Sequence, residues 1–140
     1  MKLELKHLAP YLPYGLKIEI NNYKQDYVGL RMAKITGYYF MNFEPYFTYE
    51  GGATGKSFKS FKPILRPLSD LAKEIEINGA SFIPITTYVY YNIEMDSIIG
   101  LNKTQINTPY GLMKYLFEWH FDVFGLIENN LAIDINTLNQ

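Results

Sequence analysis

The chain of 140 residues contains no cysteine, one tryptophan and two histidines. Without cysteine it can form no disulfide, thiolate zinc site or iron–sulfur cluster, and it has no cysteine nucleophile. The only side chains left to bind a metal are His7, His120 and the carboxylates. The sequence therefore predicts no metal centre and no other cofactor.

Long hydrophobic runs and a strong net charge are also missing. No run approaches the ~18 apolar residues of a membrane span, and the N-terminal segment mixes charged with apolar residues, unlike an export signal. With 48% apolar residues and a net charge of −1, the chain lies outside the composition of disordered proteins. We expect a cytoplasmic protein without a membrane partner, folded as a single domain over residues 1–140.

Tyrosine is the residue in excess, with 13 copies beside 9 phenylalanines. The chain is also rich in Lys, Ile and Asn, a set typical of genes rich in adenine and thymine, so coding bias is one explanation. Tyrosine also supplies interfaces with contact area and a polar end, so a ligand-facing aromatic surface is the other. Composition leaves both explanations open.

Residues 1–100 have mainly the pattern of an antiparallel sheet. Alternation and runs of β-branched or aromatic residues predict strands at 16–20, 27–32, 35–41 and 43–49. The glycine-rich segment 51–55 predicts a flexible loop, followed by a short strand at 58–61. The pair Asn78-Gly79 between two short apolar runs predicts a hairpin with a type I′ turn. Residues 86–101 fit a strand or a helix.

The strongest helix signal lies in the C-terminal third. Thr108 and Pro109 suit the N-cap and first helical position, apolar residues follow at helical spacing, and Gly125 suits the position after the helix end. Shorter helices are expected within 3–8 and from residue 67. The predicted class is α+β: a mainly antiparallel sheet in residues 1–100 with short helices and one major C-terminal helix.

The string from Gly51 to Ser57 ends like a phosphate-binding P-loop. The full motif needs glycine at position 50, where this chain has Glu50, and Pro63 excludes the long helix that should follow. We interpret the string as the glycine-rich loop of a hairpin. The sequence contains no pattern of a hydrolase triad or a nucleophile elbow either, which argues against an enzyme.

The same region has basic residues without acidic ones. Four basic residues alternate with two phenylalanines in the set Lys56, Phe58, Lys59, Phe61, Lys62 and Arg66. Cations with aromatic rings suit a polyanion such as single-stranded nucleic acid; the alternative is a lysine-protected sheet edge with both rings in the core. Residues 1–70 carry a net charge of +4 and residues 71–140 of −5, an asymmetry that can steer a partner.

Apolar residues surround most of the predicted C-terminal helix. Such a helix is either central to the fold or covered by a partner. If a partner covers it, the interface residues are Trp119, Phe121 and Phe124. Because Glu118 and Asp122 share one face of a helix while His120 points away, these three residues predict no metal site.

Three segments of the sequence resemble one protein family. They are HLAPYLPYGLK at 7–17, KPILRPLSDL at 62–71, and LFEWHFDVFGLI at 116–127 with LAID at 131–134. Together they resemble a family of small proteins encoded by Bacteroides-group bacteria and by their phages and mobile elements, to which no activity is assigned. The resemblance implies an intracellular phage or mobile-element setting and carries no catalytic residue over.

The sequence thus predicts a non-enzymatic interaction or accessory protein of phage or mobile-element origin. Its partner would be another protein or a second copy of the chain, bound through the C-terminal helix or a sheet edge. The alternative is a nucleic-acid-associated accessory protein that uses the basic segment 56–66.

Overall fold

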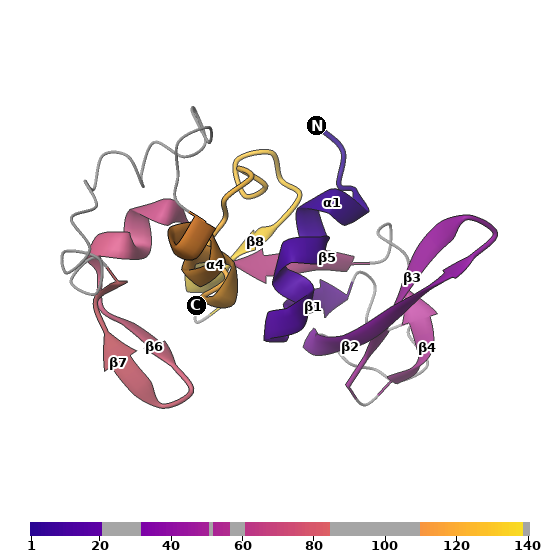
Figure 1. Ribbon diagram of the computed structural model, residues 1–140, viewed down its shortest axis with the longest axis horizontal. Coiled ribbons are helices and arrows are strands. Elements are labelled where there is room, and N and C mark those ends of the chain that lie inside the picture. The colour runs from indigo at the N-terminus through magenta and orange to yellow at the C-terminus, as the bar shows by residue number, and fades with distance from the viewer. Residues whose placement is uncertain (21–31, 51, 57–60, 85–109, 139–140) are drawn as a thin grey trace.

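The computed structural model describes residues 1–20, 32–50, 52–56, 61–84 and 110–138. Within them a six-stranded sheet has the order β4-β3-β2-β1-β5-β8, and β6 and β7 form a separate hairpin (Figure 1). All neighbours in the sheet pair antiparallel except β5 and β8. The prediction of a mainly antiparallel sheet with short helices is confirmed. The strands are β1 (Lys17–Ile20), β2 (Met32–Met41), β3 (Glu44–Tyr49), β4 (Gly52–Lys56), β5 (Phe61–Leu65), β6 (Ile75–Ile77), β7 (Ala80–Phe82) and β8 (Ile133–Asp134).

Strand β4 corrects one prediction. Its glycine-rich composition predicts a loop, yet Gly52–Lys56 is the edge strand and pairs with β3. A strand depends on its neighbour more than on local propensity, and here β3 supplies the pairing. The strand predicted at 58–61 and the one at 27–32 lie outside the described residues except for Phe61 and Met32, and 86–101 lies wholly outside them.

The described helices are all short. α1 (Leu5–Leu8) leads directly into the 3-10 helix η1 (Ala9–Tyr14), which ends at Gly15 with a φ of +68°. The other helices are η4 (Leu68–Ala72), α4 (Tyr110–Glu118) and η6 (Ile135–Thr137). Because α4 has only nine residues, the single major C-terminal helix is not found.

The end of α4 has a clear local cause. His120 has a φ of +59°, its N–H donates to the Phe117 carbonyl over 3.0 Å, and the Phe121 N–H donates to the Leu116 carbonyl over 2.8 Å. This pair of bonds is the Schellman motif, in which a left-handed residue ends the helix. His120 thus has the role predicted for Gly125, and the chain turns away five residues earlier.

Two clusters of buried side chains hold the elements together. The first packs η1 and the C-terminal segment against β1, β3 and β5, and Tyr11 lies fully buried in it. The second joins η4, β6 and α4 around Leu71, Leu116 and Phe121. Tyr11 links the two, since its hydroxyl donates to the Phe121 carbonyl over 2.7 Å.

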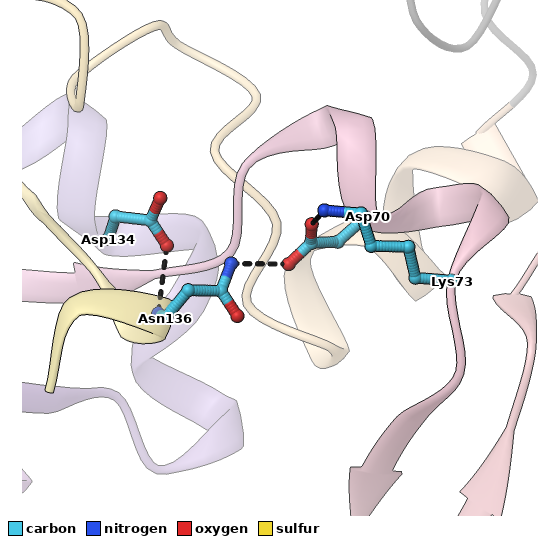
Figure 2. A network of polar contacts seen from close by, with 4 residues as sticks. All are labelled: Asp70, Lys73, Asp134 and Asn136. Carbon is cyan, nitrogen blue, oxygen red and sulfur yellow. Dashed lines mark hydrogen bonds and ion pairs between the residues drawn. The ribbon is translucent and has the colours of Figure 1, made fainter. Parts of the chain in front are cut away.

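A polar network fixes the C-terminal segment beside η4 (Figure 2). The buried Asp70 carboxylate accepts hydrogen bonds from the Asn136 amide at 2.7 Å and from the Lys73 ammonium at 2.8 Å. The Asn136 backbone N–H donates to Asp134 over 2.9 Å. The bond to Asp70 raises the pKa of Lys73. Because both Asp70 oxygens have donors, this buried charge is compensated.

Candidate functional site

The predicted basic segment is only partly described. Phe58 and Lys59 lie outside the described residues, and of Lys56 only its place in β4 is known. Phe61 is 1% exposed in the first cluster, so its ring offers no surface for stacking. Lys62 lies opposite Glu19 on β1, and its ammonium donates to the Asn130 side chain over 2.9 Å.

The aromatic residues after α4 face the interior to different degrees. Phe121 is fully buried in the second cluster and cannot meet a partner in this structure. Trp119 is partly buried, and its ring centroid lies 4.9 Å from that of Phe82. Phe124 is also partly buried and packs 5.5 Å from the His7 ring. The early end of α4 accounts for this, because it directs Phe121 inward.

Most of the large exposed apolar side chains lie instead on the β2–β3 hairpin. This hairpin lies at one end of the molecule (Figure 1). Phe43 is 101% exposed and Phe40 59%. The other exposed members are Tyr38, Tyr39, Met41 and, at the start of β2, Met32. Successive strand residues point to opposite faces, so the hairpin is apolar on both sides. We call residues Tyr38–Phe43 the aromatic tip.

The turn of the aromatic tip has an unusual residue. Met41 pairs with Glu44, which leaves Asn42 and Phe43 as a two-residue loop with φ values of +52° and +64°. Positive φ at both loop residues is typical of a type I′ turn, whose second residue is usually glycine. The β6–β7 hairpin has that glycine: Asn78 and Gly79 have φ values of +52° and +82°, as the sequence predicts. Phe43 therefore occupies a backbone conformation unfavourable for a side chain, with no packing to offset it.

A second feature is a cleft of about 360 Å³ between the sheet and the β6–β7 hairpin. Its wall includes three cations from three strands or strand ends, Lys17, Lys34 and Arg66, together with His120. The apolar part of the wall comes from Ile64, Ile77, Trp119 and Ile135, and two acids, Glu76 and Glu118, also line it.

His120 is held at this cleft by its backbone and by its ring. Its carbonyl accepts from the Arg66 N–H over 2.8 Å, and its Nε2 lies 2.9 Å from the Tyr14 carbonyl, to which it donates. Burial lowers the pKa of His120, and the nearby charges of Arg66, Lys17 and Lys34 lower it further. The hydrogen bond to Tyr14 raises this pKa but does not offset the lowering. The imidazole is therefore neutral near pH 7.

The buried titratable groups outside the cleft are satisfied structurally. Burial raises the pKa of Tyr11, so it stays a neutral phenol, which donates to Phe121 and accepts from the Val123 N–H at 3.3 Å. Burial also raises the pKa of Asp122, opposed by the N–H groups of Ile127 and Leu126, each 2.8 Å from a carboxylate oxygen. These contacts build the fold after α4 and leave no group aimed at a ligand.

Neither a metal site nor a membrane span is found in the described part of the chain. No three His, Asp or Glu side chains there are grouped to hold a metal ion, and none of the described helices is long and apolar enough to cross a bilayer. Comparison with protein-family models, curated proteins and solved structures gives no match.

The sequence contains a weak signal for the aromatic tip and none for the cleft. Residues 36–43 form an uncharged run with four aromatic residues around Asn42, a residue that tolerates the left-handed conformation. That signal could have predicted a turn, whereas the run 43–49 reads simply as a strand. The cleft residues come from distant segments, so only the folded chain reveals it.

Proposed function

We propose that this protein is a non-enzymatic interaction protein that binds another protein through the aromatic tip. The observation that carries the proposal is Phe43, whose fully exposed ring occupies a turn position where the other hairpin has glycine. Departures from local sequence rules without structural compensation are expected at functional sites. A ring at this position gains its contacts only when something outside the chain covers it.

The size of the patch supports a specific interface. The four exposed rings of the aromatic tip present on the order of 500 Å² before the methionines are counted. The largest apolar patch of a typical monomer is about 300–600 Å², and one side of a standard interface is about 800 Å². Met41, which is also exposed, enlarges the tip further, and buried aromatic residues are common hot spots.

The shape of the tip favours a different protein over a second copy. A protruding hairpin that is apolar on both faces fits a concave apolar groove, which encloses both faces. The cleft among the described residues of this chain also has five charged side chains in its wall, so its apolar part alone does not complement the tip. The partner we propose therefore carries an apolar groove, and the family resemblance supports a phage or mobile-element setting for it.

The test uses the full chain with two serine substitutions, Phe40→Ser and Phe43→Ser. Proteins captured from the source cell by the wild type are identified, purified and titrated against each variant. We expect a direct complex whose Kd rises at least about tenfold in the double variant, because hot-spot rings carry most of an interface's free energy. The matched control is Tyr115→Ser, which removes a ring that is 38% exposed on α4.

Two outcomes would overturn this function. One is a purified partner that binds the double variant and the wild type equally. The other is binding of the wild type, through the same two rings, to neutral phospholipid vesicles without any protein partner, which would assign the tip to a lipid surface. Light scattering of the wild type distinguishes a third case, since a dimer lost in the double variant would make the occupant a second copy.

A further inference from the structure

The wall of the cleft beside β6–β7 has three cations that form no ion pair among the described residues, although the more distant Asp70 carboxylate stabilises the charge of Arg66. Lys17, Lys34 and Arg66 all line the cleft, and no ion pair within 4.0 Å joins any of them to a described acid. The Arg66 guanidinium makes one hydrogen bond, 3.2 Å to the Glu76 carbonyl oxygen. By contrast, Lys73 and Lys6 each have a carboxylate partner, at 2.8 and 3.3 Å.

The arrangement of the two lysines is unfavourable by itself. Lys17 and Lys34 are direct partners across the β1–β2 ladder, and like charges at opposite positions destabilise a sheet. The charges of all three cations act on the His120 ring, so all three lie near it in the cleft wall. An anion between them would turn this repulsion into attraction.

Gly15 leaves room for the Lys34 side chain. A Cβ on Gly15 would stand 2.4 Å from Lys34 Cε and 3.2 Å from its Nζ, so the lysine side chain runs over the glycine. The φ of +68° at Gly15 also favours glycine. The chain thus leaves room at the end of η1 for a cation to lie along the cleft wall.

We propose that this cleft binds a small organic phosphate ester, with the phosphate among Lys17, Lys34 and Arg66 and the organic part against Trp119. The dianion suits three converging donors, and guanidinium groups bind phosphate through paired hydrogen bonds. A volume of about 360 Å³ suits a small molecule. The apolar side chains around Trp119 give the organic part a surface that a bare anion would not use.

A small ester fits the cleft better than a nucleic acid does. A polymer needs a basic track that extends beyond one cleft. The next described cation on the same sheet face, Lys62, faces Glu19 and is bonded to Asn130. Glu76 and Glu118 in the cleft wall would repel a continuing phosphate backbone. The site is therefore local, with no dependence on the function of the aromatic tip.

Trp119 makes the test direct, because it is the single tryptophan of the chain and lines the cleft. Wild-type protein is titrated with ribose 5-phosphate, inorganic phosphate and ribose, and tryptophan fluorescence and calorimetry follow binding. We expect saturable binding of ribose 5-phosphate that weakens with added salt, weaker binding of inorganic phosphate, and none of ribose. Lys34→Gln and Arg66→Gln should each raise the Kd about tenfold or more, since each removes a charge-assisted hydrogen bond.

Lys62→Gln is the matched control, because it removes a cation from the same sheet face outside the cleft. Lys34 is exposed, so its substitution tests the site even if Arg66→Gln fails to fold. The proposal is overturned if no phosphate compound binds at millimolar concentration, or if Lys62→Gln weakens binding as much as Lys34→Gln. Equal affinity for inorganic phosphate would overturn the assignment to an ester, and tighter binding of a single-stranded oligonucleotide would assign the cleft to nucleic acid.

Discussion

The two described hairpins that close with two-residue turns use the same turn in opposite ways. In β6–β7 the second loop residue is Gly79, which adopts positive φ without strain, and Phe82 of this hairpin packs on Trp119. In β2–β3 that position is Phe43, and the rings near the turn face solvent. The first hairpin follows the local rules and is anchored to a core, whereas the second departs from them and ends in open space. An apolar side chain in a hairpin therefore stabilises the fold only where another part of the chain covers it.

The largest expected effect tests whether the anchored hairpin is structural and the aromatic tip is not. Ile75→Ala in β6 removes a side chain that is 5% exposed in the second cluster, and should lower the free energy of unfolding by about 2–4 kcal/mol. Phe40→Ala in β2 removes a ring that is 59% exposed and should cost less than about 1 kcal/mol. Urea denaturation measures both.

Equal losses for these two variants would contradict this prediction, because they would show that Phe40 contributes as much to the fold as a buried residue. Binding of the partner gives the opposite order. Phe40→Ala should weaken the complex, whereas Ile75→Ala should leave the Kd unchanged at temperatures where the variant stays folded.

A reciprocal exchange at the turns should have a smaller effect. Gly79→Phe places a side chain at a φ of +82°, where the left-handed conformation costs about 1–2 kcal/mol of stability. The lower conformational entropy of the unfolded chain without glycine offsets about 0.5–1 kcal/mol of that loss. No atom lies within 4 Å of the new Cβ, so the loss is a backbone effect. Phe43→Gly should reverse the sign and raise stability by up to about 1 kcal/mol. Thermal unfolding monitored by circular dichroism measures both.

The exchange also separates stability from binding. Phe43→Gly should gain stability while losing affinity for the partner, which is the signature of a residue retained for function. A loss of stability in Phe43→Gly comparable to that in Gly79→Phe would show that the ring supports the fold, and would remove the main argument for the aromatic tip as a binding surface.

Sequence reasoning predicts the strands of both hairpins, but it identifies the turn of the anchored hairpin alone, and the reason is physical. Asn78-Gly79 encodes its turn locally, and the alternation of 16–20 correctly predicts β1. Phe43 is not a usual left-handed residue, so Asn42 alone gives a weak signal for the turn at 42–43, and no local signal sets the end of α4 at His120 instead of Gly125. The predicted long helix ends early because His120 is tied to the Tyr14 and Arg66 backbones, which lie far away in the sequence. The cleft is likewise a product of non-local contacts.

The smallest expected effect is on the pH dependence of stability, which should depend on the two histidines and not on the aromatic tip. Burial lowers the pKa of His120 and of His7, with the charge of Lys6 adding to the effect at His7. The unfolded chain, with histidine pKa values near ~6.5, therefore binds protons more readily than the folded chain. The contribution of the two histidines to the free energy of unfolding should be fully present above the unfolded pKa of ~6.5. It should be lost as the pH falls below that value towards the lower pKa values of the folded chain.

Urea denaturation between neutral and mildly acidic pH measures this slope, and variants locate it. His120→Asn should reduce the slope, because asparagine tolerates the left-handed backbone and does not titrate in this range. Phe43→Gly should keep the wild-type slope, since residues 36–43 contain no group that titrates in this range. An unchanged slope in both His120→Asn and His7→Gln would show that neither histidine is held neutral by the fold, and the slope would then belong to the carboxylates.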